Sequence, residues 1–110
     1  NIAAGTRILS KLQGNWKSEG LSDEECIKFT LASYNAGEAR IHDCRNLAEA
    51  KGKDHNCWDA AVEVIPLMRE DSILEEEAVK LGKFQGSETI KYVDNVMALY
   101  NAICTIHPTN

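Results

Sequence analysis

The stretch SDEECIKFTLASYNAG, residues 22–37, decides the fold prediction. It opens on Ser22 with Glu25 three positions later, a spacing typical of the capping box that starts a helix. Apolar residues follow at helical spacing, so one side of this helix is apolar. Gly37 then ends it, because glycine is the favoured residue just beyond a helix C-terminus. The stretch therefore predicts one amphipathic helix with a sharp end.

Apolar residues recur at helical spacing along almost the whole chain, and the alternation typical of strands is absent. Further helices are predicted over residues 2–12, 38–51, 58–65, 73–81 and 88–104, the last of them capped by Ser87. The polar residues 14–20 are predicted to form a connection, in which Trp16 faces solvent or an upstream domain. Trp58 begins an apolar stripe and is expected in the core. The predicted fold class is all-α.

Composition and charge exclude several functions. The 110 residues suffice for one small domain, and 44% hydrophobic residues is an ordinary globular composition. A net charge of −5 with scattered Lys and Arg argues against nucleic-acid binding. No run approaches the roughly 20 apolar residues of a membrane span, and no signal peptide is recognisable. His42, His55 and His107 share no ligand spacing, so neither a metal nor another cofactor is expected.

Four cysteines are many for a cytosolic protein of this length and suit an exported, oxidised one. They form no Cys-x-x-Cys pair, which disfavours zinc or thioredoxin-like chemistry. Cys44 and Cys57 flank the polar loop 46–56, and they are the preferred disulfide pair. The alternative is four buried thiols, since an unpaired cysteine packs well in a core.

The helix end Ser33-Tyr34-Asn35-Ala36-Gly37 is a candidate ligand-binding edge. The Tyr34 hydroxyl and the Asn35 amide offer donors and acceptors for sugar hydroxyl and acetamido groups. The small Ala36 and Gly37 allow a ligand or a second backbone to approach closely. On these residues alone, a plain helix C-cap is the alternative explanation.

Tyr34-Asn35-Ala36-Gly37 resembles the third sequence motif of the goose-type-lysozyme-like lytic transglycosylases. Other segments resemble the family in the same order. Residues 1–9 resemble its N-I-x-x-G-x-x-Y-L, residues 31–33 its A-L-A-A, Arg40-Ile41 its G-R-V, Trp58 with residues 64–67 its W…V…L-P-L, and residues 88–96 its fourth motif, E-T-x-x-Y-V-x-x-V. The resemblance covers almost the whole chain. It is greatest to the membrane-bound F branch, which has an insertion between the third and fourth motifs.

The resemblance implies a lysozyme-like helical domain of which residues 1–110 form the C-terminal part. Members of the family cleave peptidoglycan strands between N-acetylmuramic acid and N-acetylglucosamine and leave a 1,6-anhydro end. It implies that Tyr34 supports the catalytic carboxyl group and that Asn35 and Ala36 hold sugar or acetamido groups. Glu88 would contact the substrate and Tyr92 would line the cleft. The implied location is the cell envelope, periplasmic or associated with the outer membrane, with any anchor in segments not present here.

The family's first two motifs, a Glu-Ser pair and a Gly-Leu-Met-Gln segment, do not occur in the chain. The family's catalytic glutamate belongs to the first motif, so it is expected upstream of Asn1, in a longer polypeptide that includes this chain. Glu19, Glu24 and Glu25 are predicted to be exposed, whereas a catalytic acid needs burial to raise its pKa. The chain alone is therefore expected to be inactive. The alternatives are a degenerate, non-catalytic module that binds glycan or protein, and a helical interaction protein unrelated to murein.

Overall fold

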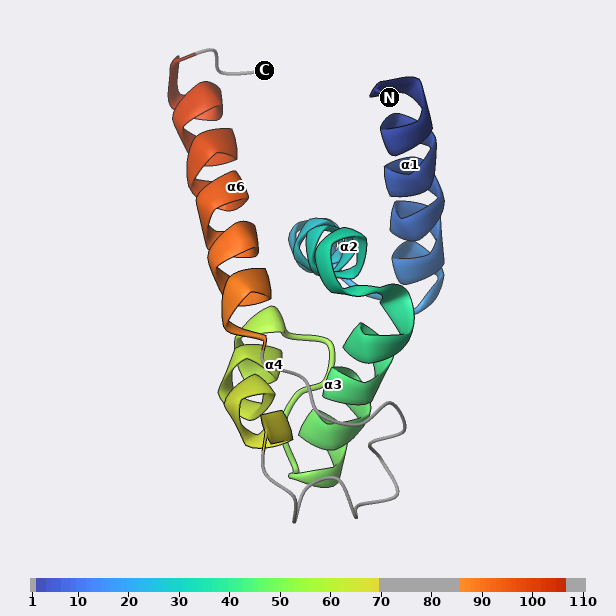
Figure 1. Cartoon of the computed structure of the whole chain (residues 1–110), viewed down its shortest axis with the longest axis vertical. Helices are drawn as coiled ribbons and strands as arrows, with labels where there is room; N and C mark the ends of the chain where they lie inside the picture. Colours follow the sequence, from blue (N-terminus) through green and yellow to red (C-terminus); the bar gives the residue numbers. More distant parts are fainter. Residues whose placement is uncertain (1, 70–85, 107–110) are drawn as a thin grey trace.

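The computed structural model describes residues 2–69 and 86–106, and side chains within residues 4–67 and 86–103. Every element in this part of the chain is a helix (Figure 1). In chain order they are α1 (Ile2–Ser18), α2 (Asp23–Ala36), α3 (Glu38–Ala50), α4 (Trp58–Val64), the 3-10 helix η1 (Ile65–Arg69) and α6 (Ser87–Ile106). The all-α prediction is confirmed, whereas the helix predicted over residues 73–81 lies outside the described residues.

Helix α1 is longer than predicted, because it continues through Gly14 to Ser18. The extension buries Trp16 completely, at 0% exposure, with its ring centroid 5.3 Å from that of Phe29 on α2. The indole N–H donates a hydrogen bond to the Ser33 hydroxyl over 2.8 Å. A glycine inside a helix costs about 1 kcal/mol, and burying a large aromatic side chain stabilises by more than that. The prediction of a polar connection with an outward-facing Trp16 was therefore wrong.

Helix α2 begins and ends where the sequence predicts. Ser22 is its N-cap, and the hydroxyl accepts a hydrogen bond from the Glu25 N–H over 3.3 Å. The Glu25 carboxylate does not complete the capping box but accepts from the backbone N–H of Trp58, the first residue of α4, over 2.8 Å. At the other end Gly37 has a φ of 101°, a conformation that residues with a side chain rarely adopt. This turn leads the chain directly into α3.

The hydrophobic core forms around α2, which contacts α1, α3, α4 and α6 (Figure 1). Its Phe29 touches two tryptophans, Trp16 at 5.3 Å and Trp58 edge-on at 5.5 Å between ring centroids. Trp58 is 2% exposed, which confirms its predicted place in the core. The other buried apolar residues are Leu21, Cys26, Ala32, Ile41, Cys44, Leu47, Ala48, Ala61, Val64, Ile65 and Val93. One central helix thus orients the elements that carry the candidate site.

A buried arginine attaches the loop between α3 and α4 to this core. Arg45 is 5% exposed, and its guanidinium donates to the His55 carbonyl over 3.0 Å and to the Asn56 side-chain oxygen over 2.7 Å. The guanidinium carbon lies 5.1 Å from the Trp16 ring centroid, and a terminal nitrogen lies 3.8 Å from the Glu19 carboxylate. Burial lowers the pKa of Arg45, and the charge of Glu19 opposes this shift.

The disulfide predicted between Cys44 and Cys57 is not formed, because Cys26, Cys44 and Cys57 each keep a thiol. Cys44 faces the core from α3 and is completely buried, whereas Cys57 is half-buried at the start of α4. Packing in the core thus explains the position of the Cys44 side chain without a disulfide. Burial, followed by the neighbouring charge of Asp43, raises the pKa of the Cys44 thiol to about 12. The alternative of buried thiols is correct for Cys26 and Cys44.

The long helices α1 and α6 flank α2, and the start of α1 and the end of α6 lie at the same end of the molecule (Figure 1). Helix α6 packs against the core through residues in its first three turns. Val93 is buried and Met97 packs against the core. Tyr100, which shares their predicted stripe, is 49% exposed. Large apolar side chains are exposed on all three helices, namely Ile8, Tyr34, Leu99, Tyr100 and Ile103.

Candidate functional site

The polar residues singled out in the sequence lie on the last turn of α2, which the core holds in place. Ser33 is 4% exposed, and its hydroxyl accepts from Trp16 while its carbonyl accepts from the Gly37 N–H over 2.8 Å. Asn35 is exposed and Ala36 is half-buried. The buried Ser33 thus fixes this turn and leaves Asn35 at the surface.

Asn35 is joined to the start of α6 by a hydrogen bond. The Thr89 hydroxyl donates to the Asn35 side-chain oxygen over 2.7 Å, although the two residues are 54 positions apart. Thr89 is 3% exposed. Ser87 is the first residue of α6 and not its predicted cap, since the Ile90 N–H donates to the Gly86 carbonyl over 3.0 Å. The hydrogen bond between Thr89 and Asn35 therefore connects the C-terminal end of α2 with the first turn of α6.

A pocket of about 490 Å³ opens at this junction. Its lining comes from the end of α2, the first turn of α3 and the start of α6, namely Asn35, Ala36, Arg40, Gly86, Ser87, Glu88 and Thr89. The pocket brings together three of the five predicted substrate-binding residues, Asn35, Ala36 and Glu88. The amide and hydroxyl groups both donate and accept hydrogen bonds, the guanidinium donates and the carboxylate accepts, so the lining suits a ligand with many hydroxyl groups.

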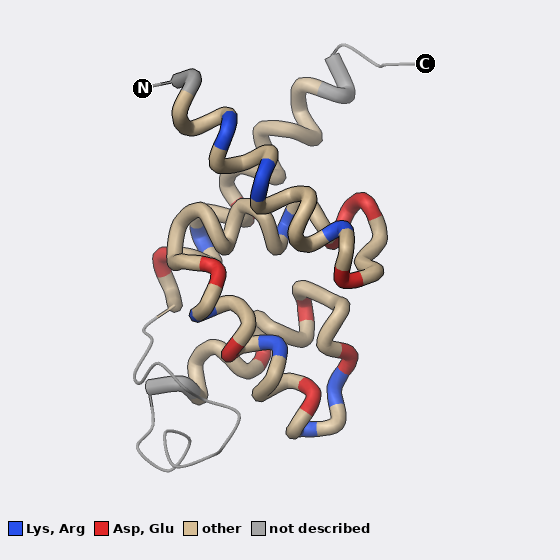
Figure 2. The backbone as a smooth tube through the Cα atoms, turned by 90° about the vertical axis from the view of Figure 1, so that its right-hand side faces the viewer, with Lys and Arg blue, Asp and Glu red and all other residues tan. Residues whose placement is uncertain are grey.

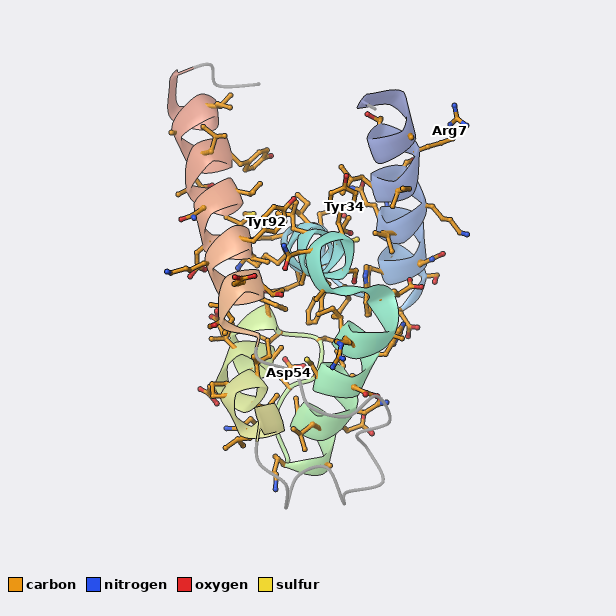
Figure 3. All side chains as sticks on the ribbon, in the orientation of Figure 1. Arg7, Tyr34, Asp54 and Tyr92 are labelled. Atoms are coloured by element: carbon orange, nitrogen blue, oxygen red, sulfur yellow. The ribbon has the colours of Figure 1, made fainter. Side chains whose placement is uncertain are left out.

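Tyr34 and Tyr92, the other two predicted residues, are not part of the pocket lining. The Tyr34 hydroxyl reaches α1, where a Cβ added to Gly5 would lie 3.3 Å from it. Tyr92 is half-buried and packs against the core. Figure 3 shows Tyr34 on the side of α2 that faces α1, and Tyr92 between α2 and α6. Their roles toward a substrate stay predictions.

Arg40, Ser87 and Thr89 also line the pocket, although no motif in the sequence predicted a binding role for them. Arg40 and Thr89 lie within segments that resemble the family. Thr89 follows Glu88 in the sequence, but helical spacing does not show which other helix the start of α6 contacts. Only the packing of α6 against α2 reveals their common surface.

Four glutamates among the described residues, Glu19, Glu24, Glu25 and Glu88, have places that do not suit a catalytic acid. Glu88 lines the pocket but is exposed. Glu19 and Glu24 are exposed, as predicted. Glu25 is half-buried, and besides its bond to the Trp58 N–H it lies 3.8 Å from the ammonium group of Lys28. An acid that protonates a glycosidic oxygen needs an apolar surrounding, and none of these four has one.

The surface carries charges of both signs (Figure 2). All charged residues of helix α1 are basic, namely Arg7, Lys11 and Lys17. Helices α2, α3, α4 and α6 each carry acidic residues. Within the described residues, no set of three His, Cys, Asp or Glu side chains is placed to hold a metal ion. None of the helices described is both long and apolar enough to span a bilayer.

Sequence comparisons find relatives that match the whole chain. It is 30% identical over 110 residues to a protein of Shewanella loihica and 32% identical over 110 residues to one of Shewanella woodyi. It is 30% identical over 104 residues to a protein of Desulfosudis oleivorans. The chain spans 22% of the length of each of these relatives. No family model and no solved structure matches it.

These relatives define the class of protein to which the chain is similar, the lytic murein transglycosylases. All three carry the same more specific name, membrane-bound lytic murein transglycosylase F. The resemblance that the motifs suggested is therefore confirmed by the names of these relatives. The all-helical architecture agrees with the lysozyme-like fold that the resemblance implies.

Proposed function

We propose that this chain is the C-terminal part of the catalytic domain of a murein lytic transglycosylase and supplies one wall of its substrate cleft. One observation carries the proposal. The 2.7 Å hydrogen bond between Thr89 and Asn35 joins the segments that resemble the family's third and fourth motifs, and both segments line one pocket. If these two segments were only helix caps, nothing would require them to line the same polar pocket.

In the proposed reaction a single carboxyl group acts twice. As an acid it protonates the glycosidic oxygen between N-acetylmuramic acid and N-acetylglucosamine, and the bond from C1 to this oxygen breaks. As a base the same group takes the proton of the C6 hydroxyl, whose oxygen attacks C1 and closes the 1,6-anhydro ring. We place this glutamate upstream of Asn1, because the family's first motif, which holds it, does not occur in the chain.

The chain's own residues would bind and orient the glycan. Asn35 and Ala36 would hold sugar or acetamido groups at the pocket, and Glu88 would accept hydrogen bonds from sugar hydroxyls. Tyr34, 44% exposed on the side of α2 toward α1, would support the catalytic carboxyl group. Tyr92 would complete the cleft wall from α6.

The partners follow from this role. Peptidoglycan strands are the proposed substrate, and the upstream part of the same polypeptide supplies the acid. The relatives are named membrane-bound, so the proposed location is the cell envelope, periplasmic or associated with the outer membrane. The exposed Glu88 also favours a second candidate, a glycan-binding module without its own acid.

The first experiment separates binding from turnover. Purified murein sacculi are incubated with the chain, bound protein is measured by co-sedimentation, and released anhydro-muropeptides are measured by mass spectrometry. We expect binding without release, and Asn35→Ala should weaken the binding about tenfold, the effect of one well-placed hydrogen bond of about 1.4 kcal/mol. Lys53→Ala is the matched control, because Lys53 is exposed on the α3–α4 loop and does not line the pocket. Steady release of anhydro-muropeptides by the chain alone would contradict the missing acid.

The second experiment tests the enzyme itself. The chain replaces the matched 22% of the Shewanella woodyi protein, and the hybrid is incubated with sacculi. We expect anhydro-muropeptides from the hybrid and a strongly reduced rate from its Asn35→Ala form. A folded hybrid that binds sacculi and releases nothing would favour the non-catalytic module.

A further inference from the structure

The hydrogen bond between Thr89 and Asn35 has a direction. The Asn35 side-chain oxygen is the acceptor and the Thr89 hydroxyl the donor, at 2.7 Å. A side-chain amide carries one oxygen and one NH2 group, which lie in the amide plane on opposite sides of the Cβ–Cγ bond axis. With the oxygen turned toward Thr89, the two N–H donors of Asn35 are directed elsewhere. Asn35 is exposed and lines the pocket, so these donors are available to a ligand there.

Burial explains why the amide keeps this orientation. Thr89 is 3% exposed, so a hydroxyl proton without an acceptor would cost free energy here. The Asn35 oxygen is that acceptor. If the amide were reversed, the Thr89 oxygen would accept from the Asn35 NH2 and its own proton would lose this partner. The described orientation satisfies both groups, and the reversed one leaves a buried donor unpaired.

We propose that Thr89 is a positioning residue that fixes the Asn35 amide so that it offers N–H donors to the pocket and thereby selects a ligand group that only accepts hydrogen bonds. Within the proposed function, on which this inference rests, that group is the carbonyl oxygen of a sugar acetamido substituent. A hydroxyl group could pair with either orientation of the amide, because it both donates and accepts. Thr89 therefore acts on the preference for N-acetylated sugars more than on the binding of sugar rings in general.

Two oligosaccharides measure this preference directly. The β-1,4-linked tetramer of N-acetylglucosamine carries acetamido groups, and the β-1,4-linked tetramer of glucose carries hydroxyl groups in their place. Both are uncharged, so the net charge of −5 does not bias the comparison. The affinity of the 110-residue chain for each is measured by NMR titration. We expect the wild-type chain to favour the N-acetylated tetramer about tenfold.

The variants separate positioning from folding. Thr89→Val removes the hydroxyl at constant shape and should reduce the preference at least about fivefold, whereas Thr89→Ser should retain it. Asn35→Asp keeps an acceptor for Thr89 but replaces the NH2 group by oxygen, and it should abolish the preference. Thr30→Val is the matched control. Thr30 lies on α2 and is buried like Thr89, but its hydroxyl has no hydrogen-bond partner. Unchanged preference in a folded Thr89→Val chain would overturn the proposal.

A second measurement tests the orientation of the Asn35 amide and does not depend on sugar binding. In the chain without ligand, the Asn35 side-chain NH2 protons should show no strong nuclear Overhauser effect to the β-proton of Thr89, because the amide oxygen faces this residue. A strong effect would mean a reversed amide and would refute the proposal. If the wild-type chain binds neither tetramer, the proposed glycan function fails, and the amide orientation is still decided by this measurement.

Discussion

The hydroxyl of Tyr34 lies against Gly5, at 3.3 Å from the place that a Cβ on this glycine would occupy. The contact joins the exposed end of α2 to the first turns of α1, two segments that both resemble the transglycosylase family. An alanine at this position would press on the tip of a side chain that is itself 44% exposed. The Tyr34 side chain can therefore move aside, but its hydroxyl then leaves its present position.

Gly5→Ala should stabilise the chain less than Gly14→Ala. Both glycines lie in α1, where alanine is favoured by about 1 kcal/mol, and nothing lies within 4 Å of a Cβ at Gly14. The free energy of unfolding from urea titration should rise by about 1 kcal/mol for Gly14→Ala and by distinctly less for Gly5→Ala. Equal gains would mean that the Tyr34 hydroxyl does not constrain position 5.

Trp16→Phe should destabilise the chain more than Trp58→Phe. Both indoles are buried beside Phe29, but only the Trp16 N–H has a hydrogen-bond partner, Ser33. Trp16→Phe loses this bond and leaves the buried Ser33 hydroxyl unpaired, at an additional cost of about 1–3 kcal/mol. Trp58→Phe removes a donor that is already unpaired. Equilibrium unfolding of both variants tests the order, and a reversed order would contradict it.

Arg45→Lys should cost about 2–4 kcal/mol of unfolding free energy, although it keeps the charge. Lysine cannot reproduce the two directed bonds to His55 and Asn56 or the contact with the Trp16 ring. Arg7→Lys on the exposed side of α1 is the matched control and should change stability by less than about 0.5 kcal/mol. Similar values for the two variants would show that Arg45 does not hold the loop.

The Cys44 thiol should make stability depend on alkaline pH. Its pKa is about 12 in the folded chain and 9.0 ordinarily, so the folded state binds the proton more tightly. The resulting stabilisation is complete below about pH 9 and is lost as pH rises toward 12, by about 1.4 kcal/mol per pH unit. Cys44→Ala should flatten the pH dependence of unfolding in this range, and Cys57→Ala should not. An equal slope in wild type and Cys44→Ala would refute the assignment.

The same burial predicts the order of alkylation. In the native chain at pH 8, iodoacetamide should modify the half-buried Cys57 much faster than the completely buried Cys44, because only the thiolate reacts. Mass spectrometry of the time course gives both rates. A resistant Cys57 together with a resistant Cys44, both released by a reductant, would restore the disulfide that the structure does not contain.

The sequence by itself determined the helical class, because the 3.6-residue spacing of apolar positions is a local property. It also determined the ends of α2, since Ser22 and Gly37 act through bonds within a few residues. The family followed from ordered motifs, which need no coordinates. Trp16 shows where local reasoning fails. Its polar neighbours indicated a connection, and only the core formed by α2 shows that burying it extends α1.

The tertiary structure decided which residues share a site. Thr89 and Asn35 are 54 positions apart, and their bond exists because α6 packs across the end of α2. The same packing places Arg40 and Ser87 beside Glu88 and separates Tyr34 and Tyr92 from that pocket. Cysteine pairing was likewise out of reach, because it depends on whether Cys44 faces the core or the loop. Contacts between helices depend on the whole core, whereas helix formation and capping depend on neighbours in the chain.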